Sequence, residues 1–304
     1  MLMSFLLTER SLSQQGLTYL RRRMGRLLTP HVVWALVPAL IYVLLYKFFR
    51  IQLANVRSLS VVGLQLLTGS TTINNVMWYM VDMIALTCIA AALYSAIKSE
   101  TGRVYAIVLL MLAALYLQYS SINYRLFNGL PSEVFPPVGR LMEMIPYMCI
   151  GLLMSRYGWL EKAKEHWLGV AIITGVMYLM CKRLMFFTEP TTYNEMEEVI
   201  TAGFAYQGLY KLVKAVILVV LFYVVPFHRL SGWIKSAILF VSNYSVGIYC
   251  MHRLIGRALN AKIFPALGWA TYSFSGCLIN FGICLLLAFA ISKLPGKWPK
   301  RAVM

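Results

Sequence analysis

The sequence predicts an all-α fold, a bundle of helices that cross a membrane several times. Of its 304 residues, 60% are hydrophobic and only 13% are charged, whereas soluble domains are about 45–50% apolar and about 25% charged. The apolar residues form long unbroken runs, and the mean hydropathy is +0.69. A membrane-spanning helix needs roughly 20 such residues, while a membrane β-barrel shows short alternating segments. The pattern therefore favours helices.

Charged residues and Pro/Gly loops divide the apolar runs into about eight predicted spans, each close to the roughly 20 residues that one crossing needs. These spans cover residues 31–49, 76–97, 104–119, 138–155, 167–185, 209–227, 237–256 and 268–292. Residues 1–30 are an apolar stub followed by a basic segment predicted to be cytoplasmic. Residues 51–70 are amphipathic and are expected at the membrane interface, whereas 186–208 form an acidic connection. We treat residues 1–304 as one membrane-embedded domain.

The net charge is strongly positive, at +17. In a soluble protein this charge would suggest nucleic-acid binding, but in a membrane protein Lys and Arg collect in cytoplasmic loops and contact anionic lipid. The side that holds both termini carries more of these residues, which predicts cytoplasmic N- and C-termini. Six cysteines lie in apolar runs without a CxxC pair, so neither disulfides nor a metal site is expected.

A basic cluster, Arg21-Arg22-Arg23-Met24-Gly25-Arg26, precedes Pro30 and the first predicted span. On a helix, Arg22 and Arg26 share a face, and Arg23 also lies one turn from Arg26. One interpretation is a positive-inside anchor that contacts lipid phosphates. The other is a set of guanidinium groups that hold the phosphates of a cytoplasmic donor, because arginine binds such oxyanions with two hydrogen bonds.

Two histidines stand next to these features. His31 follows Pro30 directly, and it is either a general base near the donor site or an interfacial aromatic side chain. His252 closes a polar stripe formed with Ser242, Ser245 and Tyr249, which recur at helical spacing along an apolar span. The stripe makes either hydrogen bonds between helices or part of a reaction site.

Two carboxylates fall inside predicted spans, Asp82 and Glu143. A carboxylate at the bilayer centre costs about 2.5–3.5 kcal/mol on insertion scales, so such residues are functional candidates. Glu143 has a structural explanation as well, because Arg140 lies one turn away and can pair with it. Asp82 has no such partner nearby in the sequence, and its alternative explanation is a structural pair with an arginine or histidine on another helix.

Three stretches match the order and spacing of a known pattern across nearly the whole chain. They are Tyr19–Pro30 with Trp34 beyond it, Trp78-Tyr79, and Ser242–His252. Together they resemble the acyltransferase 3 family of integral membrane O-acyltransferases. The last stretch, with Ser245, Gly247-Ile248-Tyr249 and His252, is similar to the family's S-x-G-I-Y-x-x-H segment.

The resemblance implies a multi-pass enzyme of the inner membrane that moves an acyl group, commonly acetyl from acetyl-CoA, onto a hydroxyl of a cell-surface or lipid-linked glycan. Arg23 and Arg26, with Arg22 beside them, take the place of the paired arginines expected at a CoA phosphate. His252 takes the place of the histidine of the late motif. Acyl-CoA is then a co-substrate, no cofactor is held permanently, and the other partners are the glycan acceptor and membrane lipids, with no nucleic acid.

Near Met1 the sequence departs from the family pattern. The family fold has about ten spans of roughly 20 residues each, and its first span carries an Arg and a His, while Met3-Ser4-Phe5 stands where a later Ser-Gly-Phe is expected. This predicts either a start upstream of Met1 or a shortened, inactive member. A different class of function stays open too, a transporter or flippase component for lipid-linked sugars with Asp82 on its polar path.

Overall fold

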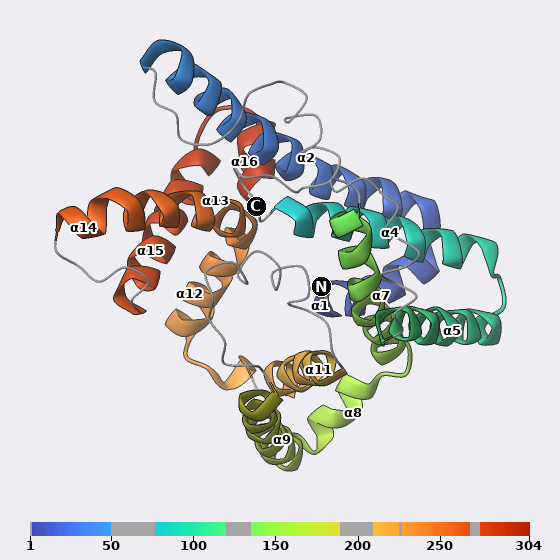
Figure 1. Ribbon diagram of the computed structural model, residues 1–304. Helices are drawn as coiled ribbons and strands as arrows, with labels where there is room; N and C mark the ends of the chain where they lie inside the picture. The colour runs from blue at the N-terminus through green and yellow to red at the C-terminus, as the bar shows by residue number, and fades with distance from the viewer. Residues whose placement is uncertain (1, 50–76, 120–134, 189–208, 225–226, 268–273) are drawn as a thin grey trace. The chain divides into compact units, whose positions relative to one another are not determined.

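The computed structural model describes residues 2–49, 77–119, 135–188, 209–224, 227–267 and 274–304 (Figure 1). Within these ranges nearly every residue is helical and no strand occurs, which confirms the predicted all-α fold. The interfacial segment predicted over 51–70 lies outside the described residues, as does the acidic part of the 186–208 connection. The described helices fall into two compact units, to which α2 and α4 both contribute.

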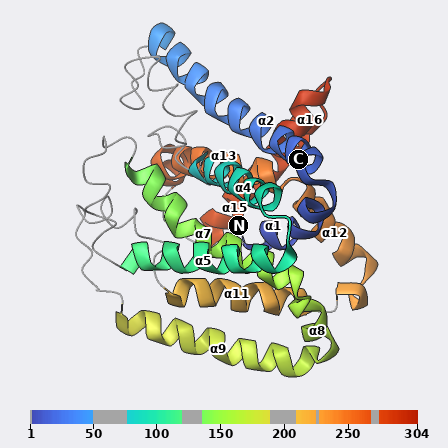
Figure 2. The ribbon, with the colours of Figure 1, turned by 90° about the vertical axis from the view of Figure 1, so that its right-hand side faces the viewer.

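Unit 1 contains Met1–Arg21 and Ala85–Arg229. Its helices are α1 (Leu2–Leu6), the first part of α2 (Glu9–Phe49), the last part of α4 (Trp78–Ala96), α5 (Glu100–Tyr119), α7 (Phe135–Arg156), α8 (Trp159–Glu165), α9 (Trp167–Thr188), α11 (Leu209–Val224) and the short η3 (Phe227–Arg229). Helix α7 packs against α1, α5 and α8. Helices α9 and α11 lie side by side in both views (Figures 1 and 2).

The apolar N-terminal stub is part of this packing. Leu2, Phe5 and Leu6 are buried on α1, and α1 meets α7 at Gly151, where a Cβ atom would lie 2.6 Å from the Leu2 carbonyl oxygen. The two backbones can approach this closely because glycine has no side chain. After the stub, α2 kinks at Gly16, whose φ of 50° is a conformation that glycine adopts readily.

Unit 2 contains Arg22–Ile84 and Leu230–Met304. Its helices are the remainder of α2, the start of α4, α12 (Gly232–Asn243), α13 (Ser245–Ala258), the π-helical η4 (Leu259–Ile263), α14 (Phe264–Ala266), α15 (Phe274–Ser292) and α16 (Lys297–Val303). Helix α13 packs against α15 and α16. The core of this unit joins these helices to α2 and α4 through Trp34, Met77, Met80, Cys250, Met251, Cys284, Ala288 and Val303.

Three described helices are long and apolar enough to cross a membrane, namely α4, Glu100–Leu117 of α5, and α15. The count becomes four if the bent pair α12 and α13 forms one span, and two shorter apolar segments, Trp167–Met180 and Leu212–Val224, lie within α9 and α11. The predicted total of eight spans stays a prediction. Exposed apolar residues recur at helical spacing on α5, at Tyr105, Leu109, Leu112 and Tyr116. Such apolar faces suit a lipid environment.

The segment predicted as a span over 237–256 is bent, and whether it crosses as one span stays a prediction. Helices α12 and α13 meet at Tyr244 with a bend of 65°. Tyr244 is buried, its hydroxyl lies 3.3 Å from Ser292 Oγ on α15, and its ring packs against Phe289. These contacts hold the bend in place. Ser242 therefore lies on α12 and leaves the predicted polar stripe, which continues on α13 as Ser245, Tyr249 and His252.

Gly247 marks the closest approach within unit 2. A Cβ atom added there would lie 2.9 Å from the Cβ atoms of Ala288 on α15 and Val303 on α16. We expect Gly247→Ala to destabilise the protein by about 1–3 kcal/mol through overpacking. The matched control is Gly282→Ala on α15, where an added Cβ meets nothing within 4 Å. Thermal unfolding in detergent should show a lower midpoint for the first variant only, and equal midpoints would contradict the three-helix contact.

Candidate functional site

The inward face of α2 carries an arginine and a histidine. The residues buried along α2 in unit 2 are Arg23, Pro30, His31, Trp34, Ala35, Pro38 and Ala39. With half-buried Leu27 they follow the spacing of three and four that marks one side of a helix. Arg23 is 8% exposed and His31 is 3% exposed, and eight residues of helix separate them by about 12 Å along the axis.

The arginine cluster is divided between two sides of α2. Arg22 and Arg26 are both exposed, while Arg23 is buried. The three guanidinium groups that the sequence groups as a phosphate site therefore do not all point the same way. Arg23 is the one placed on the same stripe as His31, so it is the arginine best placed to act within the bundle.

His252 on α13 has a defined ring orientation. Its Nδ1 lies 2.6 Å from the carbonyl oxygen of Tyr249. A carbonyl oxygen only accepts hydrogen bonds, so Nδ1 carries the proton of the neutral ring. The other ring nitrogen, Nε2, then holds the lone pair that a general base uses. The His252 residue as a whole is half-buried.

An aromatic and amide shell surrounds this histidine. The Tyr249 ring lies 5.7 Å from the His252 ring and 5.2 Å from the ring of Tyr79 on α4. From α15, the Asn280 side chain donates a hydrogen bond of 2.8 Å to the His252 carbonyl oxygen. Asn280 in turn accepts a bond from the Cys284 thiol, 3.5 Å away. Three helices, α4, α13 and α15, thus position the late motif. The sequence singled out Tyr79 as part of a matching stretch but did not show its contact with Tyr249, and it did not single out Asn280 at all.

The remaining predicted site residues are dispersed. Ser245 is exposed at the start of α13, and Tyr249 is half-buried. Asp82 on α4 and Glu143 on α7 are each 2% exposed, and they belong to unit 2 and unit 1, respectively. Arg140 is half-buried one turn before Glu143 on α7, while the pairing of these two stays a prediction. Among the described residues, no three His, Cys, Asp or Glu side chains gather in a group that could hold a metal ion.

Comparison with protein families shows the family to which the chain belongs. The family model described as an acyltransferase domain, of the acyltransferase 3 type, matches residues 1–289. The chain belongs to the acyltransferase 3 family. Comparison with curated proteins and with solved structures gave no match. The matched range covers the basic cluster, the polar stripe on α13 and most of α15, but ends before α16.

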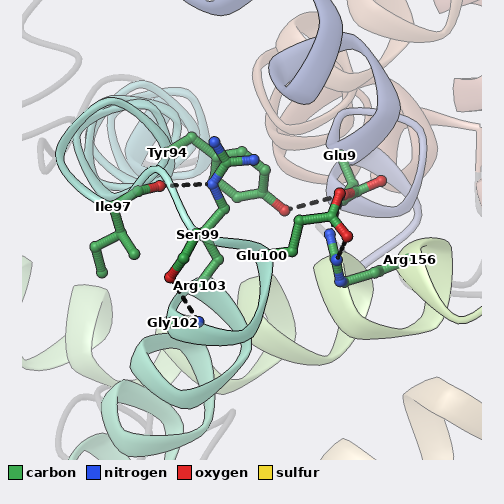
Figure 3. A network of polar contacts seen from close by, with 8 residues as sticks. All are labelled: Glu9, Tyr94, Ile97, Ser99, Glu100, Gly102, Arg103 and Arg156. Carbon is green, nitrogen blue, oxygen red and sulfur yellow. Dashed lines mark hydrogen bonds and ion pairs between the residues drawn. The ribbon is translucent and has the colours of Figure 1, made fainter.

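This acyltransferase 3 protein also has a polar network in unit 1 that the sequence did not reveal (Figure 3). Buried Glu9 at the start of α2 accepts a hydrogen bond of 3.2 Å from the Tyr94 hydroxyl and lies 3.8 Å from Arg156 Nη1. The other nitrogen of Arg156, Nη2, is 2.8 Å from the exposed carboxylate of Glu100. Arg103 completes the network, with its guanidinium 5.0 Å from the centre of the Tyr94 ring. The network joins α2, α4, α5 and α7.

One part of the network has a local sequence signal. Ser99 precedes α5, and its hydroxyl accepts a hydrogen bond of 3.1 Å from the Gly102 amide, as expected of an N-cap serine. The other partners have no such signal, because Glu9 and Tyr94 are 85 residues apart in the chain. Polar groups this distant in the chain are brought together only by the packing of the helices, in which α1 and α5 both lie against α7.

Removal of Arg156 should expose the cost of burying Glu9. We expect Arg156→Met to lower the free energy of unfolding by about 1–3 kcal/mol, because a buried carboxylate loses a cation. The matched control, Glu100→Gln, removes only an exposed partner and should cost about 0–1 kcal/mol. Thermal unfolding measures both effects, and adding Glu9→Gln to Arg156→Met should restore part of the loss. An equal loss in Glu100→Gln and Arg156→Met would contradict this assignment.

Proposed function

We propose that the protein transfers an acyl group, most simply acetyl, from acyl-CoA to a hydroxyl of a cell-surface or lipid-linked glycan. The acyltransferase 3 match over residues 1–289 supports the acyl-transfer reaction. The observation that carries the proposal further is the hydrogen bond from His252 Nδ1 to the Tyr249 carbonyl. It leaves Nε2 available to take a proton, which is what attack by a sugar hydroxyl requires.

In the proposed reaction, the acceptor hydroxyl oxygen attacks the thioester carbonyl carbon. His252 Nε2 takes the hydroxyl proton. The carbon–sulfur bond then breaks, and the CoA sulfur leaves with the electron pair and takes the proton from His252 Nε2. The products are the O-acylated glycan and CoA. His31 is the alternative candidate for this base, since it is buried on the same face of α2 as Arg23.

Arg23 is proposed to hold a phosphate of the CoA moiety. A guanidinium group binds phosphate oxygens through two parallel hydrogen bonds, and burial of the Arg23 side chain limits competition from water. Arg22 and Arg26 are exposed on the same helix. They are proposed to attract the polyanionic donor and to contact lipid phosphates. The basic cluster would then act both as a donor site, through Arg23, and as a lipid anchor, through Arg22 and Arg26.

The burial of Asp82 favours a second candidate function. It is a buried carboxylate within α4, a helix long and apolar enough to span a membrane, and such residues often lie on transport pathways. A transporter for lipid-linked sugars would use this residue on a polar path. The two functions differ in their need for a donor, since transport proceeds without acyl-CoA.

The experiment that separates them uses the purified full chain in vesicles. Acetyl-CoA and a lipid-linked glycan are supplied, and release of the CoA thiol is followed together with movement of the labelled glycan across the bilayer. The proposal predicts thiol release that depends on both substrates. Glycan movement without acetyl-CoA, in the absence of thiol release, would instead support the transporter. Asp82→Asn should abolish that movement if Asp82 lies on the path.

A further inference from the structure

Helix α16 carries a basic surface and directly follows a candidate membrane span. Helix α15 ends at Ser292, and the residues from there to Met304 include no Asp or Glu. They include four exposed cations, Lys293, Lys297, Lys300 and Arg301. This segment lies beyond residues 1–289, so the family match says nothing about it.

The inner side of α16 is firmly attached to unit 2. Trp34 Nε1 on α2 donates a hydrogen bond of 2.9 Å to the Ala302 carbonyl oxygen. Val303 is fully buried beside Gly247 and forms part of the core, and Pro299 is buried as well. Because these contacts fix the helix, its cations are held on the opposite side in a defined arrangement. The segment is thus an ordered surface in unit 2.

Apolar side chains are interleaved with these cations. Trp298 is 57% exposed and Leu294 is 52% exposed, and the Lys293 ammonium lies 5.1 Å from the centre of the Phe289 ring on α15. Tryptophan is enriched where the hydrocarbon of a membrane meets its headgroups, and α16 directly follows α15, a candidate membrane span. Clusters of four to eight Lys and Arg next to a span attract anionic lipid.

We propose that residues 293–301 form a binding site for anionic phospholipid headgroups, in addition to the acyl-transfer site. Lys297, Lys300 and Arg301 contact the headgroup phosphates, while Trp298 and Leu294 lie against the upper part of the acyl chains. The chemistry favours a lipid over a soluble phosphate compound, because the surface offers cations and exposed hydrocarbon together. The proposal does not depend on the identity of the donor or of the acceptor.

The test uses Trp298 as a reporter in the full chain reconstituted in vesicles. The probes are brominated phosphatidylglycerol and brominated phosphatidylcholine at equal mole fractions, and the Trp298 signal is the difference between the wild type and Trp298→Phe. We expect the quenching constant of Trp298 to be at least about fivefold larger for phosphatidylglycerol, since one cation near an anionic surface contributes about 1 kcal/mol.

Three variants make the test specific. The triple variant Lys297→Gln, Lys300→Gln, Arg301→Gln should bring the two quenching constants to within about twofold, because most of the local charge is gone. The control Lys162→Gln, Lys164→Gln removes exposed cations from α8 and should leave the preference intact. Thermal unfolding verifies that the triple variant remains folded. The double variant Lys297→Arg, Lys300→Arg keeps the positive charge, and it should therefore retain the preference for phosphatidylglycerol.

Equal quenching of wild-type Trp298 by both lipids would overturn the proposal. So would a preference that persists in a folded triple variant. Loss of the preference on addition of millimolar pyrophosphate, with direct binding of pyrophosphate to wild type but not to the triple variant, would assign the cations to a soluble phosphate compound and would also overturn it.

Discussion

Replacement of His252 by glutamine is expected to lower kcat for acyl transfer by about 10²–10⁴-fold, the range typical for loss of a general base. Glutamine has a similar size and can still donate a hydrogen bond to the Tyr249 carbonyl that His252 Nδ1 contacts at 2.6 Å. It cannot take a proton at the position of Nε2. The KM for acyl-CoA should change little, because the proposed role of His252 is in the transition state.

The control for this variant is His166→Gln, which changes an exposed histidine at the C-terminal end of α8. It should retain full activity. If His252→Gln keeps normal kcat while His31→Gln loses it, the base would be His31 and the assignment to the late motif would be wrong. A second check concerns Asn280, a positioning residue that bonds the His252 carbonyl oxygen, whose change to Leu should lower kcat and leave the KM for acyl-CoA close to the wild-type value.

Replacement of Arg23 by alanine should raise the KM for acyl-CoA by roughly 10- to 100-fold, since a charge-assisted hydrogen bond contributes about 1.5–3 kcal/mol. The physical reason is that the buried guanidinium is proposed to hold a donor phosphate. Arg22→Ala is the matched control one residue away on the exposed side of α2. It should raise KM by less than about fivefold, as expected for an exposed charge.

The donor itself provides an independent check on Arg23. If this residue contacts the 3′-phosphate, then dephospho-CoA thioesters should be as poor for the wild type as acyl-CoA is for Arg23→Ala, and the variant should no longer distinguish the two donors. Arg23→Lys should recover part of the affinity, because it restores the charge without the planar fork. Equal KM values for acyl-CoA in Arg22→Ala and Arg23→Ala would contradict the phosphate-binding role of Arg23. The basic cluster would then be a lipid anchor only.

Much of the helix content could be predicted from hydropathy, because each described apolar run of the expected length is helical. The periodicity of α2 also held information about the site. Leu27, His31 and Trp34 share one side with Arg23 at spacings of four, four and three, which separates Arg23 from Arg22 and Arg26. The bend at Tyr244 was less accessible, since it depends on the contacts of its side chain with Ser292 and Phe289.

Other features depend on residues far apart in the chain. The Trp34 indole and the Ala302 carbonyl are 268 residues apart, and the Asn280 amide reaches the His252 carbonyl from another helix. A helical pattern tells which side of a helix is buried, but it does not identify the helix that covers it. Buried Glu9 shows the same limit, because only the folded unit 1 brings Tyr94 and Arg156 to it.

If this protein moves an acyl group from CoA to a glycan hydroxyl, as proposed, the label of the donor acyl group must appear on the glycan. The most direct measurement incubates the purified full chain with isotope-labelled acetyl-CoA and a lipid-linked glycan and analyses the glycan by mass spectrometry. The account predicts a labelled, base-labile acetyl ester on the glycan, formed by the wild type and by His166→Gln but not by His252→Gln. A folded wild-type protein that binds both substrates and leaves the glycan unlabelled would contradict it.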